Sequence, residues 1–470
     1  MTLKQQTIQG VWWAGVAQGG RQACQVLITV LLAHLLSPRD FGLLGMTTVF
    51  TQFAMMVGEL GMTGALIQRP AVREEHYASA FWLSVMVGVI LMAIMTACSP
   101  AIARFYRTPD LQPILVAVSL SFVLQGGWVV QQAMLMRAME FRSLAIRDIA
   151  AVCLSGIMGV AAAVLGWGVW SLVWQLLVHN AAMVWLSWSF TSWRPPWRIS
   201  RQALRELSGF SAAAMGFNCV NYVSRNVDYL IIGRLLGATP LGLYTLAYKL
   251  MLLPIQNISW VIVKVLLPAF SKIQHDLESL RRNYTKVLQT VALVTLPMLG
   301  GLFVVAPEFI HVFFGPQWEG AILPFRLLAC CGVAQSLTAI GGTIYQSQGR
   351  PDLQFKMGCA NAALMALVIL FSIRWGIVGV AAGSAIFTIC WMPVSFVVAS
   401  RLIQLPYVRI WRAILPAIGL TALLMMGLFA VKHTVHTSAL STLMLLGLFG
   451  ITGYASLLVV MKHGRVALHV

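Results

Sequence analysis

Two stripes of polar side chains run along segments that are otherwise apolar. In residues 10–34 the polar positions recur at helical spacing and share one face of a helix; they are Gln18, Arg21, Gln22 and Gln25. In residues 209–234 an equivalent stripe consists of Asn218, Asn221, Arg225 and Asp228. A guanidinium combines a fixed positive charge with paired donors, so it suits phosphate or carboxylate oxygens. We therefore expect the two stripes to bind an anionic substrate.

Few other charges lie in apolar segments. A charge near the bilayer centre costs at least about 2.5–3.5 kcal/mol, so such a residue usually faces a wet cavity or a partner. Lys249 joins the candidate substrate-binding residues, whereas Lys264 and Arg326 lie near helix ends, where their charged heads can reach the interface. Glu59 and Asp228 are the acids, and either could bind a proton or Na⁺ in exchange for substrate.

A structural role for the same residues stays open. Arg21 and Arg225 could hydrogen-bond to neighbouring helices, Arg225 and Asp228 could pair with each other along one helix, and Glu59 could neutralise Arg21. Binding is favoured because whole helix faces, rather than single positions, are polar. If the two faces meet, they would line a hydrophilic cavity within the membrane.

The helices that position these residues are predicted to span a membrane. Of the 470 residues, 59% are apolar and 10% are charged, too few polar groups to cover a soluble fold. We therefore predict an all-α integral membrane protein. Windows of about 20 apolar residues predict about 14 transmembrane helices, at 10–34, 41–66, 78–100, 111–135, 145–165, 168–190, 209–234, 241–267, 287–313, 320–346, 355–374, 377–399, 410–431 and 439–461.

Lysine and arginine are distributed unevenly over the connections between spans. With the N-terminus inside, cytoplasmic segments carry 21 of these residues and the opposite loops carry 6. Cytoplasmic loops usually retain positive charge, so we predict a multi-pass protein with both termini in the cytoplasm. Because the basic residues alternate with spans instead of forming one soluble face with aromatics between them, we expect no nucleic-acid partner.

A hydrophobic pattern repeats at an offset of 200 residues. Residues 31–43 read LLAHLLSPRDFGL and residues 231–243 read IIGRLLGATPLGL, each an apolar helix, a short polar turn and a second apolar helix. Such a repeat is typical of transporters built from two like halves. It makes the helices at 10–34 and 209–234 equivalent. We expect three parts along the chain: an N-terminal bundle at 1–200, a C-terminal bundle at 201–400 and two final helices at 401–470.

Motifs for other chemistry do not occur. The sequence has no Walker A, GxSxG or HExxH motif, which argues against ATP-driven transport and the familiar hydrolases. Its 8 cysteines form no CxxC or Cys/His cluster and fall within or at the ends of predicted spans, where they suit buried apolar positions. We expect no catalytic residue, no metal and no cofactor; coupling to H⁺ or Na⁺ stays open.

Three stretches carry a resemblance to a known family. The first ends the second span and reads ELGMTGALIQR at 59–69, and the second opens the sixth span and reads GWGVWSLV at 166–173. The third, between the ninth and tenth spans, contains PEFI at 307–310, FG at 314–315 and WEGA at 318–321. In order and spacing they resemble the lipid-linked oligosaccharide flippases, bacterial polysaccharide transporters of the multidrug/oligosaccharidyl-lipid/polysaccharide exporter superfamily, above all the colanic-acid exporter group.

This resemblance implies a fold, a substrate and a location. The fold would be two pseudo-symmetric six-helix bundles related by an axis along the membrane normal, with two C-terminal helices beside the second. The substrate would be an undecaprenyl-diphosphate-linked oligosaccharide, moved across the bacterial cytoplasmic (inner) membrane by alternating access for exopolysaccharide, capsule or O-antigen synthesis. Partners would be this substrate, membrane lipids and other membrane proteins of polysaccharide assembly.

Two other functions stay open. A cation-coupled multidrug antiporter of the same superfamily would favour an acidic cavity, whereas the candidate bases Arg21, Arg225 and Lys249 outnumber the acids Glu59 and Asp228. A membrane polysaccharide polymerase or glycosyltransferase would need a substantial outer loop or soluble domain to hold a sugar acceptor, and the predicted connections offer none. We therefore expect a transporter and not an enzyme.

Overall fold

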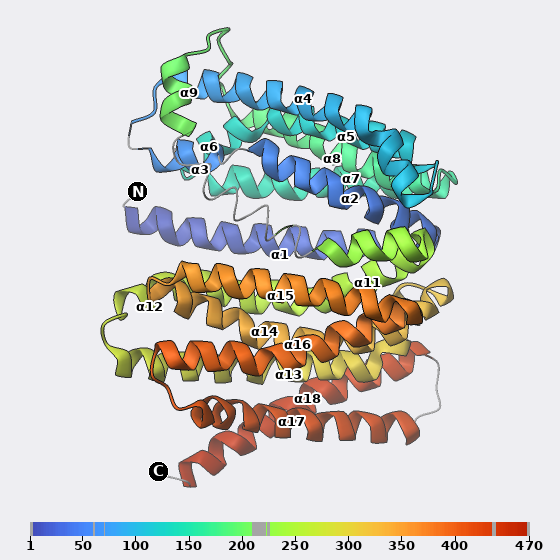
Figure 1. Cartoon of the computed structure of the whole chain (residues 1–470), viewed down its shortest axis with the longest axis vertical. Coiled ribbons are helices and arrows are strands. Elements are labelled where there is room, and N and C mark those ends of the chain that lie inside the picture. Colours follow the sequence, from blue (N-terminus) through green and yellow to red (C-terminus); the bar gives the residue numbers. More distant parts are fainter. Residues whose placement is uncertain are drawn as a thin grey trace. The chain divides into compact units, whose positions relative to one another are not determined.

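Helices form all of the regular structure in the part of the chain that the computed structural model describes, residues 3–59, 62–69, 71–208, 222, 226–434 and 439–467 (Figure 1). The chain divides into two compact units, residues 1–242 and 243–470. The all-α fold expected from the sequence is confirmed. The division at residues 200 and 400 and the grouping into six-helix bundles stay predictions.

The first unit contains nine helices within its described ranges, followed by residues 226–236 in helical conformation and the first turn of α11. The nine are α1 (Leu3–Leu35), α2 (Pro38–Glu59), α3 (Met62–Gln68), α4 (Glu74–Tyr106), α5 (Leu111–Gly126), α6 (Val129–Arg137), α7 (Phe141–Val164), α8 (Val169–Phe190) and α9 (Arg201–Ser208). Helix α1 packs against α7, and α7 in turn packs against α8.

The second unit continues α11 (Ala238–Pro254) and contains the remaining helices. They are the π-helix η1 (Ile255–Ser259), α12 (Trp260–Lys272), α13 (Leu277–Phe313), the 3₁₀ helix η2 (Pro316–Ala321), α14 (Ile322–Ser347), α15 (Pro351–Ser372), the 3₁₀ helix η3 (Ile373–Trp375), α16 (Gly376–Leu402), α17 (Tyr407–Thr434) and α18 (Ala439–Ala467). Tyr284, Leu288 and Val291 on one face of α13 are fully buried in a core shared with α14, α16 and α17.

The predicted spans agree closely with these helices. Within the described ranges, ten segments are long and apolar enough to cross a membrane, and the longest, Pro351–Leu402, contains both α15 and α16. The seventh predicted span, 209–234, is described only at 222 and 226–234. Each of the other spans coincides with one helix or with consecutive helices. A multi-pass membrane fold is therefore confirmed.

The turn between α1 and α2 follows from its local sequence. Pro38 takes the first position of α2, where a missing amide hydrogen is tolerated. Asp40 Oδ2 accepts hydrogen bonds from the amide and hydroxyl of Ser37 at 2.9 and 2.6 Å, as in a capping box. Two hundred residues later Gly237, with φ 92°, separates residues 226–236 from α11. Both copies of the repeat therefore contain the predicted helix, turn and helix.

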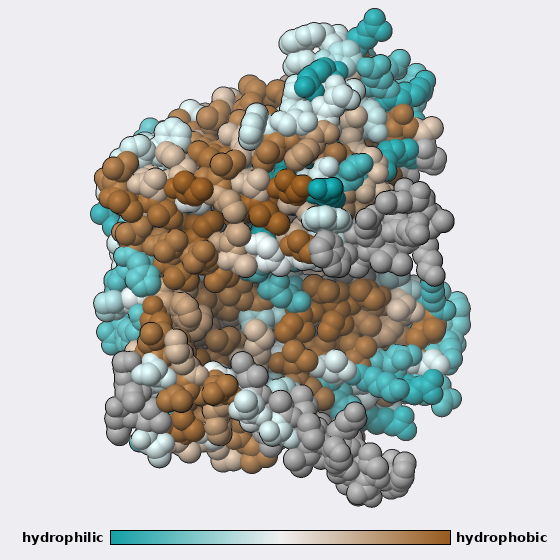
Figure 2. All heavy atoms as spheres, turned by 180° about the vertical axis from the view of Figure 1, so that it is seen from behind, coloured by the Kyte–Doolittle hydropathy of each residue, from teal (hydrophilic) through white to brown (hydrophobic). Residues whose placement is uncertain are grey.

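The outward surface of the helices is largely apolar. Ile157, Leu367 and Leu415 are each more than 60% exposed. Figure 2 shows broad apolar areas on the face it presents, with hydrophilic side chains gathered toward the ends of helices. A surface of this kind is matched by acyl chains along the middle of the helices and by headgroups and water at their ends.

Candidate substrate-binding site

The predicted stripe on α1 lies on a partly open side of this helix. Gln18 and Gln25 are exposed, while Arg21 and Gln22 are half-buried. Arg21 Nη2 donates a hydrogen bond to Gln18 Oε1 at 2.7 Å, a contact open to side chains one turn apart. Arg21 and Gln18 therefore meet on α1, and their role in binding stays a prediction.

Another side of α1 packs tightly against α7. Three pairs of residues follow one another along the two helices: Gly20 with Ile149, Cys24 with Cys153, and Ile28 with Gly156. Small residues at such positions allow the helix backbones to approach closely. The first pair places Arg21 of α1 at the level of Asp148 of α7.

Helix α7 contains an ion pair between a buried arginine and a half-buried aspartate. Arg147, only 2% exposed, donates to Asp148 Oδ1 from Nε at 2.9 Å and from Nη2 at 2.7 Å. Its Nη2 also donates to Gln132 at 3.0 Å, its Nη1 donates to Ser187 at 3.3 Å, and its Cζ lies 5.5 Å from the centre of the Trp128 ring. Arg147 therefore ties α7 to α6 and α8 and fixes the position of Asp148.

His179 connects this ion pair to α1. The ring, on α8, hydrogen-bonds to the backbone of Ala151 and lies within electrostatic range of Arg21, Asp148 and Arg147. With two guanidiniums and one carboxylate, the group carries a net positive charge. We call it the first-unit polar cluster; its members are Gln18, Arg21, Gln132, Arg147, Asp148 and His179.

Lys249, Asp228 and Arg326 have different surroundings. Lys249, on α11 in the second unit, is exposed. Asp228, in the first unit, is 8% exposed, and its Oδ1 accepts a hydrogen bond from the Tyr229 amide at 2.9 Å. Arg326 Nε donates to the Phe303 carbonyl oxygen at 3.0 Å, which indicates a structural role.

Several predicted residues lie outside the described part of the chain. They are Asn218, Asn221 and Arg225, together with the side chains of Glu59 and Lys264. In the ranges that the structure does describe, no three His, Cys, Asp or Glu side chains are grouped to hold a metal ion. The binding role of the second stripe therefore stays a prediction.

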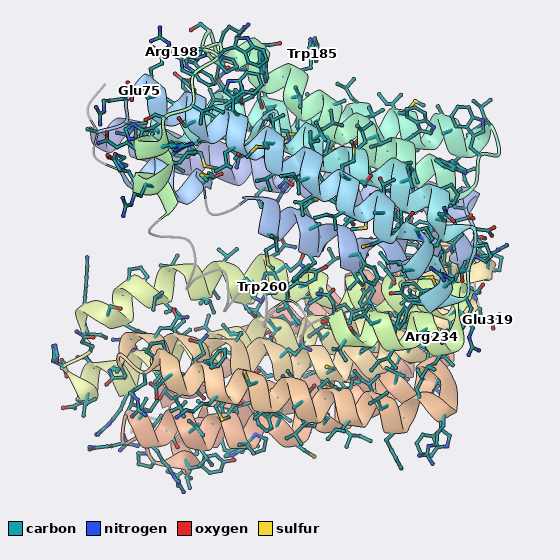
Figure 3. The ribbon with its side chains drawn as sticks, turned by 45° about the horizontal axis from the view of Figure 1, so that its top comes forward. Glu75, Trp185, Arg198, Arg234, Trp260 and Glu319 are labelled. Carbon is teal, nitrogen blue, oxygen red and sulfur yellow. The ribbon has the colours of Figure 1, made fainter. Side chains whose placement is uncertain are left out.

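The two ends of the first unit carry different groups. Glu75 and Arg198 lie at one end and Arg234 lies at the other (Figure 3). Arg234 Cζ stands 5.4 Å from the centre of the Phe105 ring, near the end of α4. The turns between α1 and α2, α4 and α5, and α7 and α8 belong to the Arg234 end, whereas α9 belongs to the other.

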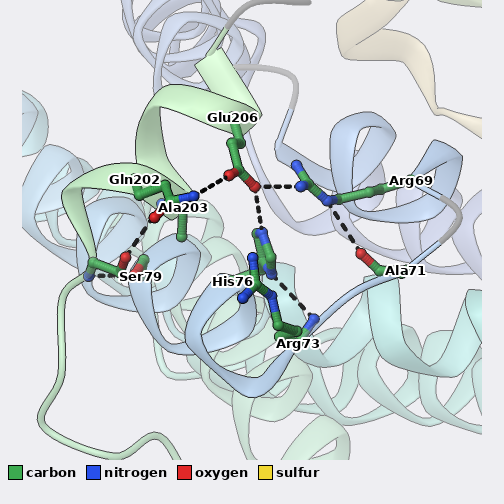
Figure 4. A network of polar contacts seen from close by, with 9 residues as sticks. Arg69, Ala71, Arg73, His76, Ser79, Gln202, Ala203 and Glu206 are labelled. Carbon is green, nitrogen blue, oxygen red and sulfur yellow. Dashed lines mark hydrogen bonds and ion pairs between the residues drawn. The ribbon is translucent and has the colours of Figure 1, made fainter.

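A second polar network fastens α9 to the first unit (Figure 4). Glu206 Oε2 pairs with Arg69 and, at 3.1 Å, with His76 Nε2, while Oε1 accepts a hydrogen bond from Gln202 at 3.0 Å. The amide of Arg73 donates to His76 Nδ1 at 3.0 Å, so the ring proton stands on Nε2 and faces the carboxylate. These hydrogen bonds, first the one from His76, and the nearby guanidinium lower the pKa of Glu206 to about 2.

Comparisons with known proteins agree along most of the chain. A model of the family described as polysaccharide biosynthesis protein matches residues 31–323. Lipopolysaccharide biosynthesis protein WzxC of Escherichia coli (strain K12) is 28% identical over 390 residues, which cover 82% of this chain and 78% of that protein. Succinoglycan biosynthesis transport protein ExoT of Rhizobium meliloti (strain 1021) is 30% identical over 333 residues, 70% of this chain and 67% of that protein.

A solved structure has the same fold. The lipid II flippase MurJ, in an inward closed conformation, superimposes with a TM-score of 0.73 at 14% identity, covering 97% of this chain and 100% of that chain. At this identity the likeness concerns the fold alone. The family match spans more than half of the chain, and the curated relatives align over most of their own length. On these grounds the chain belongs to the polysaccharide biosynthesis protein family.

Proposed function

We propose that the protein is a flippase that moves undecaprenyl-diphosphate-linked oligosaccharides across the bacterial cytoplasmic membrane by alternating access, for surface polysaccharide synthesis. Its relatives support this, since WzxC is named for lipopolysaccharide biosynthesis and ExoT for transport in succinoglycan biosynthesis. The observation that carries the proposal is the first-unit polar cluster. A net positive charge on membrane-spanning helices can attract a diphosphate and would repel a cationic drug.

Within the cluster we assign Arg21 to the diphosphate. The Nε, Nη1 and Nη2 atoms of Arg147 all donate to partners inside the unit, so Arg147 is a positioning residue. Arg21 is half-buried and its described partner is Gln18, so it is the guanidinium that a ligand can reach. Gln18, Gln22 and Gln25 extend this face of α1, and their amides can exchange hydrogen bonds with sugar hydroxyls.

The second copy of the repeat supplies the proposed counterpart. Arg225, with Asn218 and Asn221, occupies the helix equivalent to α1 in the 200-residue repeat. A diphosphate carries more than one negative charge, so a second guanidinium would share it with Arg21. The polyprenyl tail would stay among the acyl chains of the bilayer while the charged and sugar parts cross.

Two acids are candidates for coupling transport to an ion. Asp228 is buried, so binding a proton or Na⁺ there would change the charge of a poorly solvated site, and Glu59 ends α2. We propose that one of them exchanges H⁺ or Na⁺ for substrate. Asp228→Asn or Glu59→Gln would then abolish the gradient dependence of transport in a protein that still inserts. Unchanged gradient dependence in both variants would remove these acids from the mechanism.

The proposed location and partners follow from the same function. The bias of Lys and Arg supports a cytoplasmic location for both termini. The lipid-linked substrate and membrane lipids contact the helices directly. Other membrane proteins of polysaccharide assembly would receive the translocated glycan on the extracytoplasmic face of the membrane.

Complementation of a flippase-deficient bacterial strain tests the proposed function in cells. Wild-type protein should restore the surface polysaccharide, Arg21→Lys should restore part of it, and the Arg21→Ala, Arg225→Ala double variant should restore almost none. Arg104→Ala is the matched control, because Arg104 is an exposed arginine near the C-terminal end of α4 and is not part of the first-unit polar cluster. Full complementation by the double variant at equal membrane levels would show that these arginines do not bind the substrate.

A further inference from the structure

A pocket opens at the end of the first unit where α2, α5 and α8 begin. Its volume is about 350 Å³, and pockets of about 300–1,000 Å³ hold small organic ligands. The chemistry of its lining comes from Arg39 and Asp40 of α2, Asp110 before α5, and Trp167 and Trp170 beside the start of α8. None of these residues belongs to the first-unit polar cluster. The charge bias predicts this end to be extracytoplasmic.

Two glycines shape the wall that carries Trp167. Gly166 and Gly168 have φ values of 79° and 55°, a region that other residues rarely adopt. A Cβ on Gly168 would lie 3.3 Å from Asp40 Oδ1, so the turn rests on this carboxylate. The other oxygen, Oδ2, is held by Ser37. The GWGVW sequence therefore builds a turn that presents indole rings beside a fixed carboxylate.

The polar side chains of the pocket are open to a ligand. Arg39 Nη2 pairs with Asp110 Oδ2 at 2.8 Å, and the two side chains are 60% and 61% exposed. Exposed ion pairs of this kind contribute little to stability, so an incoming hydroxyl can share either partner at small cost. Trp167 and Trp170 are 44% and 38% exposed in the same pocket.

Flat apolar rings next to carboxylates and a guanidinium match a pyranose. One face of a pyranose consists of C–H groups that can pack on an indole, and its edge consists of hydroxyls that donate to carboxylates and accept from a guanidinium. One guanidinium and two carboxylates give the lining a net negative charge, which disfavours a phosphate. An acyl chain would desolvate three charged groups without compensation. Tryptophans that only form an interfacial aromatic belt do not require two carboxylates and a guanidinium beside them.

We propose that this pocket binds one or two sugar residues of the transported glycan on the face of the membrane where the glycan emerges. The choice of ligand rests on the proposed flippase function, but the site is separate from the α1 stripe. Its solvent-exposed lining suits weak and reversible binding, which is required if the glycan is to be released from the protein after translocation.

The test measures binding of the free glycan to the purified protein in lipid nanodiscs. The probe is the reducing oligosaccharide repeat unit hydrolysed from the host's own surface polysaccharide, and saturation-transfer NMR reports its affinity. Trp167→Ala and Asp110→Ala should each weaken binding, the first by about tenfold or more, as expected when an aromatic anchor of a pocket is truncated. Trp167→Phe should keep most of the affinity, because phenylalanine retains an aromatic ring. This variant also serves as a control for a folding defect caused by the loss of Trp167.

Trp185→Ala is the matched control. Trp185 also lies on α8, is 64% exposed and points away from the helices (Figure 3), so its loss should leave the affinity unchanged. Equal affinities of wild-type and Trp167→Ala protein, or no binding by a wild-type protein that transports lipid-linked glycan, would overturn the pocket proposal alone. Absence of transport by folded wild-type protein would instead overturn the flippase proposal.

Discussion

Gly42 and Gly242 approach each other backbone to backbone: a Cβ on Gly242 would stand 3.0 Å from the Gly42 amide nitrogen and would overlap the Pro38 carbonyl oxygen. A Cβ on Gly42 would in turn overlap the carbonyl oxygen of Ala238. All four residues belong to the first unit and occupy equivalent positions in the 200-residue repeat, at the starts of α2 and α11. The close approach is therefore possible because neither glycine has a side chain.

Gly42→Ala and Gly242→Ala should each destabilise the protein. The added methyl group has no space unless the backbone shifts, and overpacking of this kind costs about 1–3 kcal/mol, occasionally more. Thermal unfolding in detergent, followed by size-exclusion chromatography of the remaining folded protein, measures the effect. Gly15→Ala is the control, because no atom lies within 4 Å of the added Cβ and alanine favours a helix by about 0.5–1 kcal/mol. Equal melting temperatures for all three variants would contradict the close contact.

Glu206→Gln should release α9 from the first unit. The change removes the negative charge that pairs with Arg69 and His76. Trypsin should then cut faster after Arg201 and Arg205 in protein held in nanodiscs. Glu75→Gln, which changes an exposed acid at the same end, should leave the cleavage rate unchanged.

The same contact predicts a pH dependence. The pKa of Glu206 is lowered from an ordinary value of 4.5 to about 2, so the unfolded state takes up the proton first as the pH falls. The stabilisation of α9 by Glu206 should be complete above pH 4.5 and lost as the pH falls toward 2. As the pH falls through this range, an acid protease should cut the α9 segment of wild-type protein progressively faster, toward the rate of Glu206→Gln protein, in which the contact is already lost. Parallel pH profiles would contradict the assignment.

Arg147→Ala should destabilise the first unit strongly. It leaves the half-buried Asp148 without its cation; breaking a fully buried pair typically costs about 3–5 kcal/mol, and this partly exposed pair should cost less. Arg142→Ala is the matched control on the same helix, since Arg142 is exposed and its Cζ only stacks over the Trp13 ring at 5.8 Å. Membrane levels and melting temperature should fall for the first variant and hold for the second. If membrane levels and melting temperature fell equally in both variants, the burial of Arg147 would not explain the destabilisation.

Much of the fold follows from the sequence because bilayer thickness fixes how long an apolar helix must be. The turns of the repeat are also predictable, since Pro38 and Gly237 act through local backbone geometry. The polar face of α1 can be predicted because its polar residues recur in the sequence at helical spacing. These features depend on neighbours in the sequence and not on distant contacts.

The polar cluster and the pocket depend on contacts between distant segments. Arg147 stands near the start of α7 and is one of the 21 basic residues predicted to lie on the cytoplasmic side, yet packing against α6 and α8 buries it. His179 is a single polar residue in an apolar segment and gives no periodic signal. The pocket joins Asp40, Asp110 and Trp167, which meet only because three turns lie at one end of the unit.

Reporter fusions test the predicted topology. Fusions at Arg39 and Arg107 should behave as extracytoplasmic, and fusions at Ser200 and Asp276 should behave as cytoplasmic, because the basic residues are concentrated on the latter side. Alkaline phosphatase and green fluorescent protein activities report the two sides. A cytoplasmic result at Arg39 would reverse the orientation and place the proposed sugar pocket on the inner face.

Transport by the purified protein tests the central claim most directly. Liposomes would carry labelled undecaprenyl-diphosphate-linked oligosaccharide, with an H⁺ or Na⁺ gradient imposed, and a membrane-impermeant glycosidase would report the accessible fraction over time. Wild-type protein should transfer the lipid far faster than protein-free liposomes. Arg21→Ala should slow transfer about ten- to a hundredfold, the loss of one charge-assisted hydrogen bond, and Arg104→Ala should not. Transfer by folded wild-type protein at the protein-free rate would contradict the account.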